Sequence, residues 1–138
     1  MGVLNNMETQ EELREERDEI LDELRLVEIN LGGKEGDLMK FEKAFTRIGS
    51  RLISLVQKYR EVDLTKATDS FLNRLHEDLT SIEGILETKL MAYKAFSGRE
   101  ETIPGYEPAS MMCEGLMGRV RRAMRDKAEY EEFGGGFE

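Results

Sequence analysis

One apolar stripe in the middle of the chain constrains the fold more than any other feature. Between residues 38 and 62, large apolar side chains recur in alternating steps of three and four without an exception. This spacing places them on one face of an α-helix, which Ile53 and Val56 widen enough to touch two neighbours. Burial of each such side chain stabilises by roughly 1.5–3 kcal/mol, so the face must be covered, within the chain or by another chain. The pattern predicts a central helix over residues 37–61, capped by Asp37, with the stripe Leu38, Phe41, Phe45, Ile48, Leu52, Leu55, Tyr59 and Val62.

A second stripe precedes it and predicts a helix over residues 9–31. Thr9 and Glu12 have the spacing of a capping box, and Gly32 and Gly33 predict the end of the helix. Arg17 occupies the one seam position where an apolar residue is missing. The seam itself consists of Leu13, Ile20, Leu24, Val27 and Leu31.

A third helix is predicted over residues 65–97. Its seam slips by one position after Gly84, which predicts a bend or a change of neighbour there. The seam consists of Leu72, Leu75, Leu79, Ile82 and Leu86, then Leu90 and Tyr93. Residues 60–65 contain neither Gly nor Pro, and we favour a tight turn there; the alternative is one continuous helix over residues 38–96, about 88 Å long, that needs a partner chain.

Residues 98–108 read as a linker, because two glycines and two prolines oppose a continuing helix. A final helix is predicted over residues 109–130, with Pro108 at its first position and Gly115 and Gly118 allowing close approach of another backbone. Its stripe consists of Cys113, Leu116, Val120 and Met124. Residues 131–138 are expected to form a flexible acidic tail.

These elements predict an all-α fold: an antiparallel helical bundle or coiled-coil hairpin of three long helices, over residues 1–97, plus a shorter C-terminal helix. The face of the central helix and the far end of the third helix are the expected contact surfaces for other chains. No run approaches the ~18 apolar residues that cross a bilayer, and the first residues lack a secretory signal. A single cysteine without a disulfide framework favours the cytoplasm or another reducing compartment, with a virion as an alternative.

The chain offers little chemistry, and we expect no enzyme, catalytic residue, cofactor or metal site. The only histidine, His76, has Asn73 where a di-metal bundle needs Glu, and Cys113 falls on an apolar stripe as a buried small hydrophobe. Gly33-Lys34 lacks the remaining residues of a phosphate loop. No carboxylate falls at a position of the apolar stripes, where burial would raise its pKa towards the range that acid–base catalysis needs.

A basic run in this acidic chain, whose net charge is −9, is the sharpest candidate for binding. Arginine forms paired hydrogen bonds with carboxylate and phosphate, so the run suits an acidic protein or nucleic acid. The plainer interpretation pairs it with the acidic first helix, in the same chain or a neighbour. The run consists of Arg119, Arg121, Arg122, Arg125 and Lys127.

The first helix carries the densest acid, with ten acids and three bases in residues 1–31. A solvated face is the plainer interpretation; the functional one is mimicry of a phosphate backbone that blocks a DNA-binding protein. The candidate face consists of Glu11, Glu12, Glu15, Glu16, Glu19 and Glu23. In the tail, Phe133 and Phe137 are candidate anchors for a groove on another protein.

From the sequence we therefore expect a non-enzymatic helical-bundle protein that mediates protein–protein assembly, as adaptor, scaffold or virion component, through a protein partner or self-association. The alternative is a nucleic-acid-related regulator that binds through the arginine helix or acts as an acidic DNA mimic. No membrane partner is expected.

Overall fold

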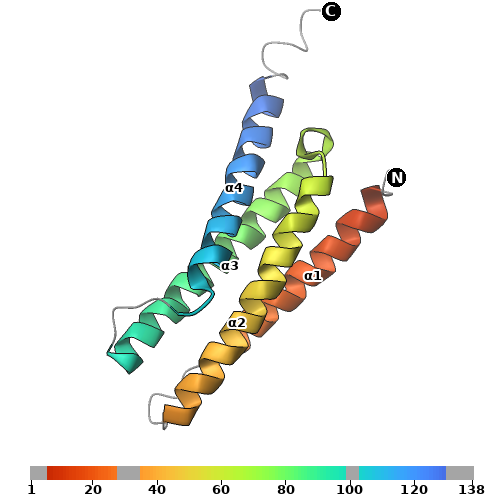
Figure 1. The fold of residues 1–138 in the computed structure, drawn as a ribbon. Helices are drawn as coiled ribbons and strands as arrows, with labels where there is room; N and C mark the ends of the chain where they lie inside the picture. Colours follow the sequence, from red (N-terminus) through yellow and green to blue (C-terminus); the bar gives the residue numbers. More distant parts are fainter. Residues whose placement is uncertain (1–5, 28–34, 99–102, 130–138) are drawn as a thin grey trace, which may run out of the picture.

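The protein is an all-α bundle of four helices (Figure 1). The structure, a computed structural model, describes residues 6–27, 35–98 and 103–129, with side chains from Glu11 and from Leu38 onward in the first two ranges. Within these ranges there is no β-strand, and no helix is long and apolar enough to cross a membrane. The helices are α1 (Asn6–Leu26), α2 (Glu35–Lys58), α3 (Asp69–Ser97) and α4 (Tyr106–Glu129).

Consecutive helices run in opposite directions (Figure 1). α1 and α4 each pack against both α2 and α3, so the four helices form a closed ring in the order α1, α2, α4, α3. Arg17 pairs with Asp78, and Lys89 reaches the backbone of Arg25, which shows that α1 and α3 lie side by side and parallel. α4 starts beside the middle of α2 and extends past the end of α2 in Figure 1.

The apolar stripe of α2 is covered within the chain. Phe45, Ile48, Leu52 and Tyr59 have no exposed surface, and only Val62, beyond the helix, is half-buried. The far end of α3 is covered in part, because Tyr93 is buried and its ring lies 6.1 Å from that of Phe41 on α2, whereas Met91 is 66% exposed. Our expectation that the apolar face of α2 receives another chain is therefore wrong, since this face belongs to the bundle's own core.

The connection between α2 and α3 is a turn, as favoured above. Two short 3-10 helices, Tyr59–Glu61 and Leu64–Lys66, flank extended residues at Val62 and Asp63. The Asp63 carboxylate accepts the backbone N–H of Thr65, and the Thr68 hydroxyl accepts the N–H of Phe71 at 3.1 Å to cap α3. Side chains thus satisfy backbone groups that a continuous helix would have paired.

Several helix boundaries differ from those predicted, among them the end of α2 at Lys58 instead of residue 61 and the start of α3 at Asp69 instead of residue 65. α1 begins at Asn6, so Thr9 lies inside the helix and is not its cap, and it ends at Leu26, before the β-branched Val27. α2 begins at Glu35, which places Asp37 in the first turn instead of at the cap. Residues 28–34, including the predicted stop at Gly32 and Gly33, lie outside the described residues.

The C-terminal helix is longer than predicted. α4 begins at Tyr106 and has 24 residues, as many as α2. Pro108 lies in its first turn, where the backbone N–H groups have no partner within the helix, so proline costs no hydrogen bond there. Gly105, with φ at 88°, makes the turn into the helix, and Gly98, with φ at 69°, ends α3.

The close approach between backbones occurs at a different glycine from the two predicted. A Cβ on Gly49 of α2 would lie 3.5 Å from the Gly105 carbonyl oxygen and 3.7 Å from the Ala109 Cβ. At Gly115 and Gly118 of α4 a Cβ would meet nothing within 4 Å. The prediction of close approach at these two is wrong, because both lie on the exposed face of α4.

Candidate functional site

A buried polar network joins three of the helical segments. The Arg17 guanidinium of α1 is 1% exposed and binds the Asp78 carboxylate of α3 through Nη2 at 2.8 Å and Nε at 2.9 Å. Its Nη1 donates to the hydroxyl of Tyr59, and Arg74 binds the second oxygen of Asp78 at 3.3 Å. Burial is the main cause that raises the pKa of Tyr59. The network therefore holds a charged pair inside the core with both partners satisfied.

The sequence pointed to only half of this network. Arg17 stood out because it interrupts an apolar seam, but Asp78, one position before Leu79 of the third seam, was not singled out. Our expectation that no carboxylate occupies a position of the apolar stripes is wrong in that Asp78 is buried with the seam, at 7% exposure. Its position three residues after Leu75 was the available signal, since that is one of the two helical spacings of the seam.

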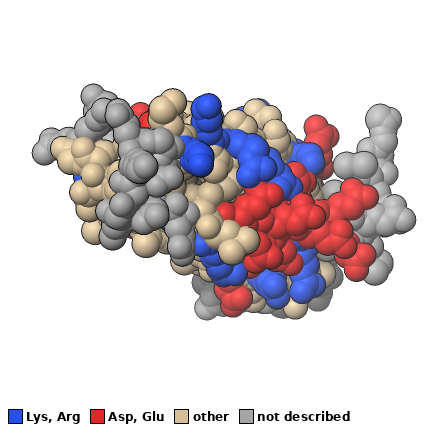
Figure 2. Space-filling view, turned by 90° about the horizontal axis from the view of Figure 1, so that it is seen from below, with Lys and Arg blue, Asp and Glu red and all other residues tan. Residues whose placement is uncertain are grey.

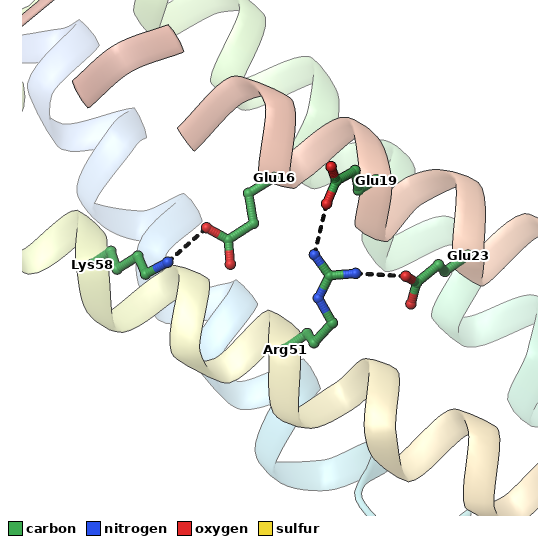
Figure 3. A network of polar contacts seen from close by, with 5 residues as sticks. All are labelled: Glu16, Glu19, Glu23, Arg51 and Lys58. Atoms are coloured by element: carbon green, nitrogen blue, oxygen red, sulfur yellow. Dashed lines mark hydrogen bonds and ion pairs between the residues drawn. The ribbon is translucent and has the colours of Figure 1, made fainter. Parts of the chain in front are cut away.

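The acidic face of α1 is divided between an interhelical edge and solvent. Arg51 of α2 lies between two glutamates, binding Glu19 at 2.9 Å and also Glu23, while Lys58 binds Glu16 at 2.8 Å (Figure 3). The carboxylates raise the pKa of Arg51, chiefly through the hydrogen bond with Glu19. Half of the candidate acidic face therefore pairs with α2.

The other half faces solvent. Glu11, Glu12 and Glu15 are exposed. Figure 2 shows one continuous patch of acidic side chains, with lysines and arginines along its borders. The bordering bases limit the extent of the acidic surface, whereas a phosphate backbone carries negative charge alone.

Among the side chains that the structure describes, the basic run of α4 forms no ion pair with α1. α4 packs on α2, α3 and the turn at Leu64–Lys66, so the expected internal pairing with the acidic helix is wrong. Lys127 instead binds Asp69 at 3.1 Å and donates to the Ala67 carbonyl. Arg119 donates to the carbonyls of Tyr59 and Val62 at 3.4 and 3.5 Å.

The remaining three arginines of the run, Arg121, Arg122 and Arg125, are exposed. Arg121 lies near Glu83 of α3. Its positive charge lowers the pKa of the Glu83 carboxyl and so partly offsets the increase caused by burial and by Glu114. Arg122 lies over the turn that connects α2 and α3, near Asp63 and Asp126. The run is thus split: its two flanking members anchor α4 to the turn, and its centre faces solvent.

A groove with both apolar and basic lining lies next to this run, between α2 and α4. It encloses about 380 Å³, with Val56, Met112 and Leu116 among the side chains that line it. Arg60 and Arg119 also line it, and both are exposed, as is Met111, which is 70% exposed. Sequence reasoning missed this groove, because its lining comes from two helices whose register is set by the fold.

A second group of ionisable side chains lies between α3 and α4. Burial, followed by the nearby Glu114 charge, raises the pKa of Glu83, whose Oε1 is buried without a hydrogen-bond partner among the described residues. Cys113 is fully buried beside them, and burial raises its pKa to about 12. The prediction of a buried Cys113 is confirmed, and its thiol stays protonated at neutral pH.

No group of three or more His, Cys, Asp or Glu side chains that could hold a metal ion occurs within the described ranges. His76 is half-buried at the edge of the α3 seam. The candidate anchors Phe133 and Phe137 lie outside the described residues.

No protein-family model matches this chain, and no curated protein or solved structure matches it either.

Proposed function

We propose that this chain is a non-enzymatic protein-binding module, and that its contact surface is the outer side of α4 together with the groove between α4 and α2. One observation carries the proposal: the exposed side chains of Arg60, Arg119 and Met111 line one groove between α2 and α4. Protein interfaces are enriched in arginine and methionine, and both line this groove.

The alternative function is binding to nucleic acid through the same arginines. Arg122 and Arg125 are exposed and free to approach a phosphate backbone from solvent. Against this alternative, Asp63 and Asp126 lie beside Arg122, and a chain with net charge −9 repels a polyanion as a whole. The apolar part of the groove lining also has no role in contacts to phosphate, which favours the protein partner.

The test is affinity isolation of the full chain from its native cells, divided into nuclease-treated and untreated halves. We expect defined protein partners that survive nuclease and are lost from the Arg122→Glu/Arg125→Glu variant. Lys43→Glu/Arg47→Glu is the matched control, because it reverses the same charge at exposed positions of α2. Partners that disappear with nuclease would move the function to nucleic acid, and partners equally lost from both variants would reflect net charge alone.

A further inference from the structure

The groove between α2 and α4 has closed ends and an open side. At one end, Gly49 allows the two helices to touch, since a Cβ there would lie 3.7 Å from the Ala109 Cβ. At the other end, Arg119 reaches across to the carbonyl of Tyr59. Between these contacts the helices leave about 380 Å³ that the chain's own described side chains do not fill.

Gly115 keeps this space open. An interior glycine destabilises a helix by about 1 kcal/mol relative to alanine, and a close backbone neighbour is the usual compensation. Gly49 has such a neighbour, but a Cβ on Gly115 would meet nothing within 4 Å. Gly115 lines the groove, so its missing side chain deepens a surface that the bundle itself does not occupy.

The charges at the rim select the kind of occupant. Arg60 from the 3-10 helix Tyr59–Glu61 and Arg119 from α4 both line the groove. The accessible apolar surface beside them comes from the exposed Met111 and the half-buried Met112, while Val56 and Leu116 are buried. A guanidinium at an apolar rim favours a carboxylate on the incoming chain, because that ion pair is partly desolvated on binding. An apolar segment with basic flanks would be repelled from the same place.

We infer that this groove receives an acidic segment of a partner protein, which inserts a large apolar side chain beside Gly115 and pairs carboxylates with Arg60 and Arg119. The inference rests on the proposed function and adds to it the chemistry of the partner. The thioethers of Met111 and Met112 adapt to the shape of the inserted side chain.

The first experiment is selection of a random-peptide display library on the full-length protein, followed by counter-selection on the Gly115→Leu variant. We expect the peptides that depend on Gly115 to be rich in Asp and Glu and to contain Phe, Leu or Met. Gly118→Leu is the matched control, because it places the same side chain at an equally open and exposed position of α4 outside the groove lining. Peptides that are basic, or that bind the Gly115→Leu variant as well as the natural chain, would overturn the inference.

Methyl NMR then locates the selected peptide. The methyl signals of Met111 and Met112 should shift on titration, whereas those of Met39 and Met91, which are 55% and 66% exposed on other helices, should stay in place. Arg60→Glu/Arg119→Glu should weaken binding by at least about tenfold, the effect of losing rim charges that act together. Lys43→Glu/Arg47→Glu, which reverses two charges at exposed positions of α2 outside the groove lining, should change it much less. Equal shifts at all four methionines would contradict a groove site.

Two other results would show that the groove holds something other than a segment of a partner protein. A shift of the Met111 methyl on Phe133→Ser/Phe137→Ser without peptide would identify the chain's own C-terminal residues in the groove. Concentration-dependent sedimentation that Gly115→Leu abolishes would identify a second copy. These measurements use purified protein, so they fail or succeed independently of the partners isolated from cells.

Discussion

The protein contains two sets of charged contacts between helices, and they differ in burial. Arg17 and Asp78 join α1 to α3 inside the core, with side chains 1% and 10% exposed. Arg51 and Lys58 join α2 to the acidic face of α1 at the surface, where the two basic side chains are 31% and 56% exposed. Geometry is similar in both sets, with nitrogen–oxygen distances of 2.8–2.9 Å.

The comparison shows that burial decides what an ion pair does. A surface pair between exposed side chains contributes about 0–1 kcal/mol, because water solvates each partner nearly as well alone. A buried pair contributes little as a unit, but the loss of one partner leaves a charge without water or counter-charge. The core pair therefore determines which position of α1 fits against α3, and the surface row adds modest stability to an arrangement already set.

The largest expected effect follows from removal of one buried partner. Asp78→Ala leaves the Arg17 guanidinium unpaired in the core, and we expect a loss of about 3–5 kcal/mol in the free energy of unfolding, measured by urea denaturation with circular dichroism. Replacement of both partners, Arg17→Met/Asp78→Leu, should recover most of that loss. A double variant as unstable as Asp78→Ala would show that packing, and not the unpaired charge, causes the loss.

A smaller loss of stability is expected when Arg17 keeps its ion pair with Asp78 but loses one hydrogen bond. Tyr59→Phe removes the hydroxyl that accepts from Arg17 and leaves that N–H unpaired in the core. The free energy of unfolding should fall by about 1–3 kcal/mol in the same assay. An unchanged free energy of unfolding would mean that the Arg17 guanidinium finds another hydrogen-bond acceptor. The buried network would then tolerate the loss of a partner as readily as the surface ion pairs do.

The surface row should respond weakly and depend on salt. Arg51→Ala removes the pairs with both Glu19 and Glu23, and we expect a loss of about 0.2–1 kcal/mol per pair at low ionic strength, decreasing as salt is added. Arg47→Ala, at an exposed position of the same helix, controls for the change in helix propensity. A loss of stability as large as that of Asp78→Ala would show that burial does not decide how much the removal of an ion-pair partner costs.

The smallest effect concerns Glu83, a half-buried carboxylate. Burial and the nearby Glu114 raise its pKa, so the native state binds its proton more tightly than the unfolded chain does. Ionisation of Glu83 therefore costs native stability at neutral pH, and this cost disappears as the pH falls towards the usual pKa of 4.5. Glu83→Gln should be the more stable protein at pH 7 and lose its advantage near pH 4, as followed by thermal unfolding.

Glu87→Gln, at an exposed position one turn further along α3, controls for the change in net charge. An advantage of Glu83→Gln that stays constant from pH 7 to pH 4 would show that the amide, and not the lost charge, stabilises the protein.

The helices were predictable because their signals are local. The stripe from Leu38 to Tyr59 repeats at helical spacing, and every one of its members is buried. The turn before α3 was favoured on local chemistry, with Asp63 and Thr65 as the candidate caps. Asp63 does cap the segment that follows it, whereas the cap of α3 is Thr68 and not Thr65. Helix ends were less predictable, as Tyr106 shows, because the first turn of a helix tolerates many residues, including proline.

The candidate site was only partly predictable. The arginine run of α4 is visible in the sequence, but its division into anchoring and exposed members depends on the turn at residues 59–67, some 60 residues away. The groove beside Gly115 requires α2 and α4 to adopt one register. Neither property follows from residues that are neighbours in the chain.

The sequence by itself determined the fold class and the core faces of the helices, because helical periodicity acts over a few residues. It favoured a break between α2 and α3 but left a continuous helix as the alternative, which the structure excludes. Only the tertiary structure decided which helices are neighbours, and hence that Arg17 meets Asp78, that the acid of α1 pairs with α2, and that α4 leaves a groove beside Arg60 and Arg119. The physical reason is that side chains from distant segments meet only after the helices have packed, and many packings bury the same apolar faces about equally well.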